Sequence, residues 1–294
     1  MLCYSTGSLP FGATPEQIVQ WLLPTPFRGI EWVISPNDLK LTTDQSHWFG
    51  IRKTFEARGF RVSNIHLGFP RLLSESPHRP GLAALNPTSR SHRTEAALSA
   101  ARIAHLLGSP HITVTSGLPE IVGGMPADAF CGPAFYERPP GARSPDFNLQ
   151  CKTFEMELAL LIRHKPASVA VLIEQEPEMV IHSTEQVLTL CQKFEGEVFS
   201  NLDVGHSAVI CEDISKAILS LGRYLRNVHL EDIAGQKHQH LLFGQGDIDF
   251  TALFSSLRAQ KYDGDLTPDL YPFSEDPEFA LSASAQFLRR FGHY

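Results

Sequence analysis

The sequence predicts an α/β fold, a single (β/α)8 TIM barrel that spans residues 1–294 and has extended loops after its third and fourth strands. Short apolar or β-branched runs alternate with longer amphipathic ones, which is typical of parallel strands joined by crossover helices. Eight runs of each kind follow one another along the chain. Polar residues end many of the short runs, and no G-x-G-x-x-G follows the first one, which argues against the alternative of an open, doubly wound sheet.

The expected elements follow from these runs in chain order. The strands are residues 2–6, 29–34, 61–66, 111–115, 168–174, 198–203, 226–230 and 264–270. The helices are residues 14–23, 46–58, 94–107, 149–163, 184–194, 214–221, 250–260 and 280–291. Residues 169–173 are apolar throughout, as in a strand that is buried on both faces. Thr14 and Ser183 each precede an early glutamate and a glutamine, which is a helix-start signature.

Two connections, residues 67–93 and 116–147, are too long for ordinary turns. Both follow the C-terminal end of an expected strand, which is where a barrel of this kind places its active site. We therefore expect them to form walls or lids of the site. Disordered surface insertions are the alternative.

Composition excludes several classes of protein. The chain has 294 residues, 43% of them hydrophobic, which is enough to bury a sizeable core. Its formal net charge of -7 makes a nucleic-acid partner unexpected. Five widely spaced cysteines without a C-x-x-C pair indicate neither a disulfide scaffold nor a thiolate zinc site. Since we find no secretory signal and no apolar run of about 18 residues, we expect no membrane partner and a cytoplasmic protein.

Acidic and imidazole side chains recur at the ends of the expected strands. They are His66, Glu174, Asp203 with His206 shortly after it, His229 and Asp269. If all strands point one way, these groups converge on one rim, and a set without thiolates suits a divalent ion such as Mn, Mg, Co, Zn or Fe. Taken singly, each histidine could be a hydrogen-bonded core residue and each carboxylate a helix cap. Together they favour shared metal binding, because unpaired buried carboxylates carry a large desolvation penalty.

Four segments resemble the xylose isomerase-like TIM barrels, a superfamily of sugar phosphate isomerases and epimerases that also includes the AP endonuclease family 2 enzymes. They are V-L-I-E at 171–174, N-L-D-V-G-H at 201–206, V-H-L-E-D at 228–232 and G-Q-G-D-I-D-F at 244–250. The D-x-G-H and V-H-L-x-D pair is the most specific part, with 26 residues from Asp203 to His229. The resemblance extends from Gly29 to Tyr271.

In the epimerase branch, one divalent ion is held by Glu, Asp, His and Glu. The resemblance assigns these roles to Glu174, Asp203, His229 and Asp269. The last is a departure, because aspartate is one methylene shorter than glutamate, and it puts the family's two-base mechanism in doubt. Glu174 is the better candidate base, and Glu176 is a reserve.

The AP endonuclease branch has further metal ligands. By resemblance, His66, His206, His238 and His240 fall at ligand positions of that branch, His238 standing where that branch has aspartate. A further histidine expected after the fourth strand is replaced by Thr115, so a complete trinuclear site is doubtful. A second metal ion at His206, His238 and His240 is one interpretation; in the other, these histidines contact substrate or lie in a solvated loop.

The resemblance implies a divalent-metal-dependent sugar or sugar-phosphate isomerase or epimerase, which removes a proton next to a carbonyl through a metal-stabilised enediolate. Glu174 or Asp269 would move the proton, and His206 would hydrogen-bond or protonate a substrate hydroxyl. The other expected substrate contacts are His66, Glu176, His238, His240 and Arg93, the last as a phosphate ligand. The alternatives are an AP endonuclease-like phosphodiester hydrolase, a lyase or dehydratase, and a non-catalytic metabolite-binding barrel. A homo-oligomer is also open, although no helix shows an unmistakable interface stripe.

Overall fold

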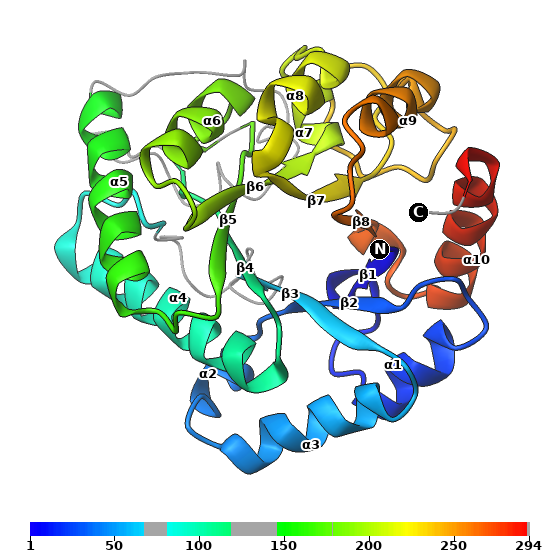
Figure 1. Cartoon of the computed structure of the whole chain (residues 1–294), viewed down its shortest axis with the longest axis horizontal. Coiled ribbons are helices and arrows are strands. Elements are labelled where there is room, and N and C mark those ends of the chain that lie inside the picture. Colours follow the sequence, from blue (N-terminus) through cyan, green and yellow to red (C-terminus); the bar gives the residue numbers. More distant parts are fainter. Residues whose placement is uncertain (68–80, 119–145, 178, 293–294) are drawn as a thin grey trace.

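The computed structural model describes residues 1–67, 81–118, 146–177 and 179–292. Eight parallel strands form one sheet in the order β1 to β8, so every strand lies beside its neighbour in the sequence. A parallel bridge between Leu2 and Leu266 joins the last strand to the first. Figure 1 shows the strands as an inner ring with the helices around it. The predicted (β/α)8 barrel is therefore confirmed.

The strands lie close to the expected ranges. They are β1 Cys3–Ser5, β2 Gly29–Val33, β3 Arg61–Leu67, β4 His111–Val114, β5 Ala170–Glu174, β6 Val198–Asp203, β7 Leu225–Leu230 and β8 Asp265–Pro268. The α-helices are α1 Pro15–Leu22, α2 Pro36–Lys40, α3 Gln45–Glu56, α4 Pro87–Leu107, α5 Phe147–His164, α6 Thr184–Lys193, α7 Val204–Val209, α8 Ile214–Leu221, α9 Phe250–Ala259 and α10 Pro277–Leu288. Most of the two long connections expected after the third and fourth strands, residues 68–80 and 119–145, lies outside the described residues.

Helix α4 begins well before the expected residue 94. Asn86 caps it by accepting a hydrogen bond from the Ser89 amide at 3.0 Å, and Pro87 occupies its first position. Proline suits that position because its fixed φ matches the helix and its missing N–H would have no partner there. The expected start was wrong because residues 87–93 are polar and lack the apolar spacing by which a helix is recognised.

Two short helices lie outside the expected set, α2 and α7. The second matters for the site, because α7 starts directly after β6 and is capped by Asp203, whose side chain accepts from the His206 amide. The alternative of a solvated loop is therefore wrong for His206, since it lies buried in the first turn of a helix. The hydrogen bond of the cap holds the Asp203 carboxylate next to the backbone of His206.

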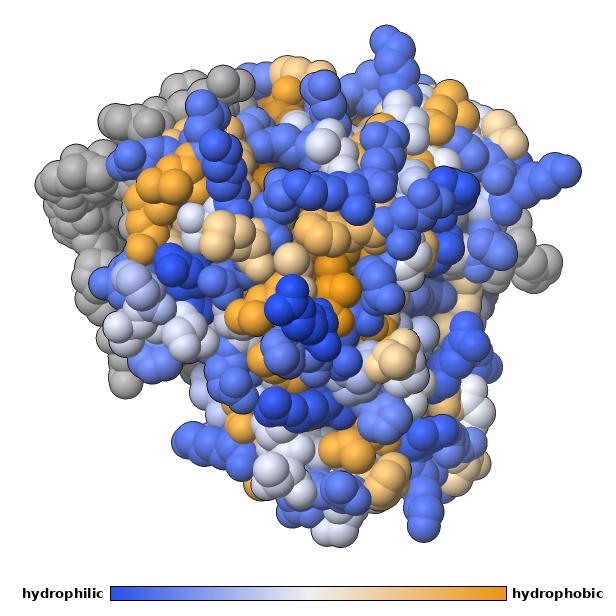
Figure 2. Space-filling view, turned by 60° about the vertical axis from the view of Figure 1, so that its left-hand side comes forward, coloured by the Kyte–Doolittle hydropathy of each residue, from blue (hydrophilic) through white to orange (hydrophobic). Residues whose placement is uncertain are grey.

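The described surface carries both hydrophilic and hydrophobic side chains. On the face shown in Figure 2, hydrophilic residues surround smaller hydrophobic patches. Helix α5 exposes three large apolar side chains, those of Leu149, Met156 and Leu160. Self-association through this or any other face stays a prediction. Among the described helices, none is both long and apolar enough to cross a bilayer.

The helix caps give a first test of the fold. Ser183 accepts a hydrogen bond from the Gln186 amide at 3.3 Å, and the Gln186 side chain reaches back to the Ser183 amide at 3.2 Å. Ser183→Ala should lower the free energy of unfolding by about 1 kcal/mol, because it leaves helix α6 without its cap. Ser255→Ala, in the exposed part of α9, should change it by less than about 0.5 kcal/mol. Equal effects of the two changes in chemical denaturation would contradict this assignment.

Candidate metal centre

The parallel register brings the expected ligands to one mouth of the barrel. Glu174 and Asp203 end β5 and β6, and Asp203 lies opposite His229 of β7. Asp269 follows the last residue of β8, and its amide donates to the Leu230 carbonyl at 2.9 Å, which continues the ladder beyond the strand. All four side chains therefore lie at the C-terminal ends of their strands, where barrels of this kind hold their sites.

Donor atoms of the other three residues lie within 4 Å of His229 Nδ1. Asp203, His229 and Asp269 form one group of metal-binding type, while Glu174 belongs to two groups that overlap it. His229 Nδ1 lies 2.8 Å from Glu174 Oε1, 3.7 Å from Asp203 Oδ2 and 3.9 Å from Asp269 Oδ2. A cation bonded at about 2.1 Å to each donor leaves neighbouring donors roughly 3 to 4 Å apart. The side chains are almost fully buried except for that of Asp269, which is 19% exposed. The arrangement suits one divalent ion with an open side at Asp269.

The two carboxylate oxygens of Asp203 give the most direct indication of whether these residues could hold a metal ion. Its Oδ1 accepts the His206 amide at 2.9 Å as the cap of α7, whereas its Oδ2, also buried, has no hydrogen-bond partner. The helix-cap interpretation is therefore confirmed for Oδ1, and Oδ2 is left without a hydrogen-bond donor from the described residues. Within the described parts of the chain, no lysine or arginine forms an ion pair with Glu174 or Asp203. A buried carboxylate oxygen without a donor is costly, so the residues present fit a metal ion.

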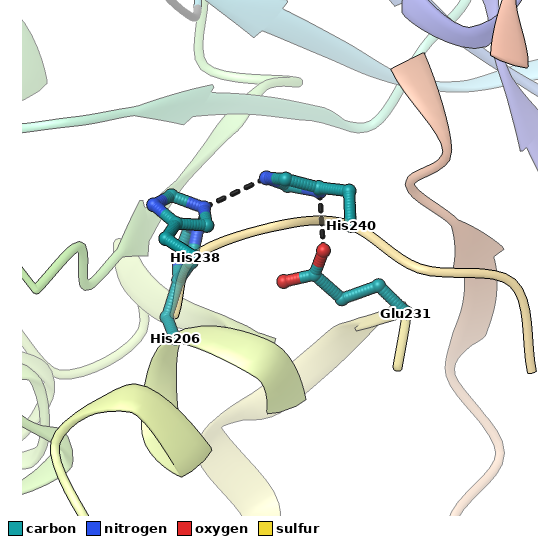
Figure 3. A group of neighbouring side chains, drawn as sticks. All are labelled: His206, Glu231, His238 and His240. Carbon is teal, nitrogen blue, oxygen red and sulfur yellow. Dashed lines mark hydrogen bonds and ion pairs between the residues drawn. The ribbon is translucent and has the colours of Figure 1, made fainter. Parts of the chain in front are cut away.

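A second cluster lies beside the first and consists of His206, Glu231, His238 and His240 (Figure 3). His238 Nε2 lies 3.0 Å from Nε2 of His206 and 2.7 Å from Nε2 of His240. The Nδ1 atoms of His206 and His240 face the backbone carbonyls of Gln175 and Asp269 at 2.7 and 3.0 Å. Because a carbonyl only accepts, each Nδ1 carries a proton, and in neutral rings the Nε2 lone pairs then converge on one point. Imidazoles held this way are suitable metal ligands.

Glu231 completes this cluster, and sequence reasoning gave it no role. It is fully buried, and its Oε2 lies 2.5 Å from His240 Nδ1. Burial first, and then the charge of Asp203, raises the pKa of Glu231 well above its usual range. Its position two residues after His229 was a usable signal, because side chains two apart along a strand point to the same side. A Cβ on Gly205 would collide with this carboxylate, which explains the glycine in D-x-G-H.

Asp232 shapes the loop that carries His238 and His240. Its Oδ2 accepts the amides of Gly244 and Gly246 at 2.8 and 2.9 Å. Its Oδ1 accepts the amides of residues 233 and 248, so one carboxylate closes the loop at both ends. The aspartate of V-H-L-x-D and the glycines of G-Q-G are thus structural partners. Sequence reasoning used both motifs only as marks of resemblance.

The remaining expected residues lie around the mouth. His66 Nε2 lies 2.6 Å from Glu174 Oε2, so His66 contacts the first cluster directly. Arg93 reaches from α4 to donate to the Leu67 carbonyl at 2.7 Å, at the end of β3. Burial lowers the pKa of Arg93 to about 10 despite the opposing charge of Glu176. Glu176 belongs to no cluster of metal-binding type among the described residues.

Comparison with known proteins adds the family. A family model described as xylose isomerase-like TIM barrel matches residues 20–291. No curated protein matches the sequence.

Solved structures match the fold over nearly the whole chain. A 3-keto-D-glucoside 4-epimerase from E. coli has a TM-score of 0.73 at 18% identity, covering 98% of both chains. An L-ribulose 3-epimerase has a TM-score of 0.74 at 15% identity, covering 99% of this chain and 93% of the other. A structure described as IOLI protein with a binding zinc atom has a TM-score of 0.75 at 12% identity, covering 99% and 97%. At these identities the likeness shows the fold.

The glycine of D-x-G-H provides a structural test of the second cluster. Gly205→Ala should lower the free energy of unfolding by about 1–3 kcal/mol, because the added methyl group overlaps the buried Glu231 carboxylate. Gly50→Ala is the matched control, since Gly50 lies in α3 with open space around its Cα and alanine favours a helix by about 0.5–1 kcal/mol. Chemical denaturation of both variants checks this. A Gly205→Ala protein as stable as the native one would show that Glu231 does not pack there.

The charge state of His229 predicts how metal binding depends on pH. Burial alone would lower the pKa of His229, but the carboxylates of Glu31 and Glu174 outweigh it and raise this pKa well above 6.5. In metal-free protein the protonated ring therefore stabilises the fold below about pH 6.5, and this contribution is lost as pH rises through the folded pKa. An ion that binds Nδ1 must displace the proton, so affinity should rise by up to about tenfold per pH unit at pH values below the folded pKa of His229. Calorimetry in buffers of different protonation enthalpy measures the released proton, and a pH-independent affinity would contradict the assignment.

Proposed function

Because this chain belongs to the xylose isomerase-like TIM barrel family, we propose that it is a divalent-metal-dependent sugar or sugar-phosphate isomerase or epimerase. The observation that carries the proposal is the convergence of Glu174, Asp203, His229 and Asp269 at the barrel mouth. The structural neighbours support it, since several are described as sugar epimerases. The substrate is then a small sugar or sugar phosphate.

In this proposal, Glu174, Asp203, His229 and Asp269 hold the ion. Such an ion, when bound, supplies a positive charge next to the substrate carbonyl and lowers the energy of the negative charge that develops on proton removal. Asp269 is the ligand nearest solvent, so its side of the site is where substrate enters. The ion is Mn, Mg, Co, Zn or Fe, in keeping with a donor set of oxygens and imidazoles.

Glu174 takes and returns the proton. Burial would raise the pKa of Glu174, but the charges of His229 and His66 outweigh it and lower this pKa well below its usual range. The carboxylate is therefore ionised at neutral pH and can accept a proton. His66 holds Glu174 Oε2 at 2.6 Å and so aims it. Asp269 is the second candidate base, limited by its shorter side chain.

His206 and the outer residues orient the substrate. The backbone carbonyl of Gln175 accepts from His206 Nδ1 and thereby fixes the ring. His206 Nε2 is then directed at the space near His238. From there Nε2 of neutral His206 accepts a hydrogen bond from a substrate hydroxyl, and it protonates that hydroxyl only in the imidazolium form, which is disfavoured because burial lowers the pKa of His206. Where no second ion is bound, His238 and His240 contact the substrate as well. Arg93 is the proposed ligand of a phosphate or another anionic group, and Glu176 is a further proposed substrate contact.

The second cluster favours one other candidate, a metal-dependent phosphodiester hydrolase. His206, His238, His240 and Glu231 offer a second ion a donor set, and Asp203 Oδ2 lies 4.0 Å from His206 Nε2, between the two clusters. Two neighbouring ions suit displacement at phosphorus. The acidic net charge of -7 counts against a nucleic-acid substrate, so this candidate ranks second. Two or three tightly held zinc ions together with cleavage of abasic DNA would reverse the ranking.

Solvent deuterium exchange tests the proposed reaction. Protein loaded with Mn²⁺ should exchange deuterium into the carbon next to the carbonyl of at least one member of a panel of ketoses, aldoses and their phosphates, as read by mass spectrometry and NMR. Loss of water in the product would indicate a lyase, and binding without exchange would indicate a metabolite-binding barrel. Full activity after removal of metal by a chelator would contradict the proposal.

Variants of the site should separate metal binding from proton transfer. Asp203→Asn and His229→Ala should lose the ion and at least about 10²-fold of the exchange rate together, because each removes a ligand. Glu174→Gln should keep part of the metal, since an amide oxygen still binds weakly, yet lose proton transfer because the amide has no basic oxygen. Metal content by elemental analysis and exchange rate are measured on the same samples. A Glu174→Gln protein with native exchange would rule out Glu174 as the base.

A further inference from the structure

Glu31 is a buried carboxylate inside the barrel to which neither the motifs nor the proposed reaction gives a role. It lies in β2 and is 1% exposed. One of its oxygens, Oε2, lies 2.8 Å from His229 Nε2, and accepts from the amides of Asn64 at 2.8 Å and Asn227 at 3.3 Å. Three donors from β3 and β7 thus meet at one carboxylate oxygen. Among the described residues, no lysine or arginine pairs with it.

The partners of Glu31 are themselves held by further hydrogen bonds. The Asn64 amide also donates to Thr113 Oγ1 at 2.7 Å, and Thr267 Oγ1 donates to Asn227 Oδ1 at 2.9 Å. Strands β2, β3, β4, β7 and β8 therefore share one polar layer inside the barrel. In most barrels of this kind, branched apolar side chains fill this interior. The hydrogen bonds of this layer hold the Glu31 carboxylate in one place, although the Asn64 Oδ1 atom itself has no partner among the described residues.

The backbone is adjusted to aim this side chain. The register between β2 and β3 shifts between Ile30 and Glu31, so that Ile30 pairs with Val62 but Glu31 pairs with Asn64. An irregularity of this kind re-aims the side chains beside it and is frequent next to active sites. Here it places Glu31 opposite the asparagine that donates to it. The bulge and the hydrogen bonds are independent observations that lead to the same side chain.

We propose that Glu31 is the positioning residue of the metal centre, which holds His229 with its proton on Nε2 and its Nδ1 facing Glu174, Asp203 and Asp269. A carboxylate only accepts hydrogen bonds, so the nitrogen at 2.8 Å from it carries the hydrogen. The other nitrogen, Nδ1, is then the one that gives its lone pair to an ion. Asn201 Nδ2 lies 3.1 Å from the same Nε2, but an N–H cannot donate to an N–H, so this contact is no hydrogen bond when Nε2 carries the proton. With the side-chain amide turned over, Asn201 Oδ1, which has no other partner in the described chain, would accept from Nε2. This inference rests on the proposed function only for the divalent ion that His229 is proposed to bind.

The isosteric change Glu31→Gln tests this role, with Glu31→Ala as a second variant and Thr113→Val as the matched control. Thr113 is buried in the same polar layer but contacts Asn64 and not His229. Loss of an outer partner of a metal-bound histidine typically lowers metal affinity by 10- to 100-fold. Both Glu31 variants should therefore bind Zn²⁺ and Mn²⁺ about 10- to 100-fold more weakly in competition titrations. Thr113→Val should stay within about threefold of the native protein, because the bond to His229 is kept.

NMR of the ring nitrogens provides the readout that a merely structural role would not move. In zinc-loaded native protein labelled with ¹⁵N-histidine, His229 should show a proton on Nε2 and metal bonding at Nδ1, and Glu31→Gln should lose or broaden that Nε2 proton. Unchanged affinity and an unchanged Nε2 proton in Glu31→Gln would overturn the inference while leaving the proposed function intact. If native protein holds no ion, the proposed function fails instead. The tautomer of neutral His229 in metal-free protein then decides, with a proton on Nε2 supporting the inference and a proton on Nδ1 overturning it.

Discussion

Negative charge is buried at the mouth of this barrel without a permanent positive partner. Glu174 and Asp203 lie at the ends of adjacent strands, both almost fully buried, and the described lysines and arginines do not reach them. Desolvation of each carboxylate costs several kcal/mol, and the imidazoles of His66, His206 and His229 offset part of it. A divalent cation would neutralise these groups together. The other features of the site follow from this requirement, because each of them keeps a donor pointed at the same small space.

The fold meets that requirement through backbone geometry. Parallel register sets Asp203 opposite His229, and a cap fixes Asp203 so that only one of its oxygens remains for an ion. Asp232 gathers the amides of the following loop and thereby holds His238 and His240 near His206. Burial of Glu231 is possible because the residue facing it is Gly205. The two clusters are thus built from short motifs in which one residue supplies a donor atom and its neighbour makes room or closes a turn.

The sequence alone was sufficient to predict the barrel and the polar side chains that end its strands. Short apolar runs that alternate with amphipathic ones are a strong signal of strands and helices. A polar residue that ends such a run is easy to see, as at Glu174 and Asp203. Glu31 was missed because it lies within a strand between Ile30 and Trp32, where nothing distinguishes an inward from an outward side chain. The true start of α4 was missed because its first turns are polar. Hydrogen bonds across five strands depend on register, which spacing along one segment does not reveal.

Crystals of the protein grown with Mn²⁺ and measured near the manganese absorption edge test the central claim most directly. The account predicts an anomalous peak at the barrel mouth within about 2.0–2.4 Å of Glu174, Asp203, His229 and Asp269, bonded to Nδ1 of the histidine. The account is contradicted if no anomalous peak lies near these side chains and they remain in direct contact with one another, with His229 Nδ1 still paired with the Glu174 carboxylate.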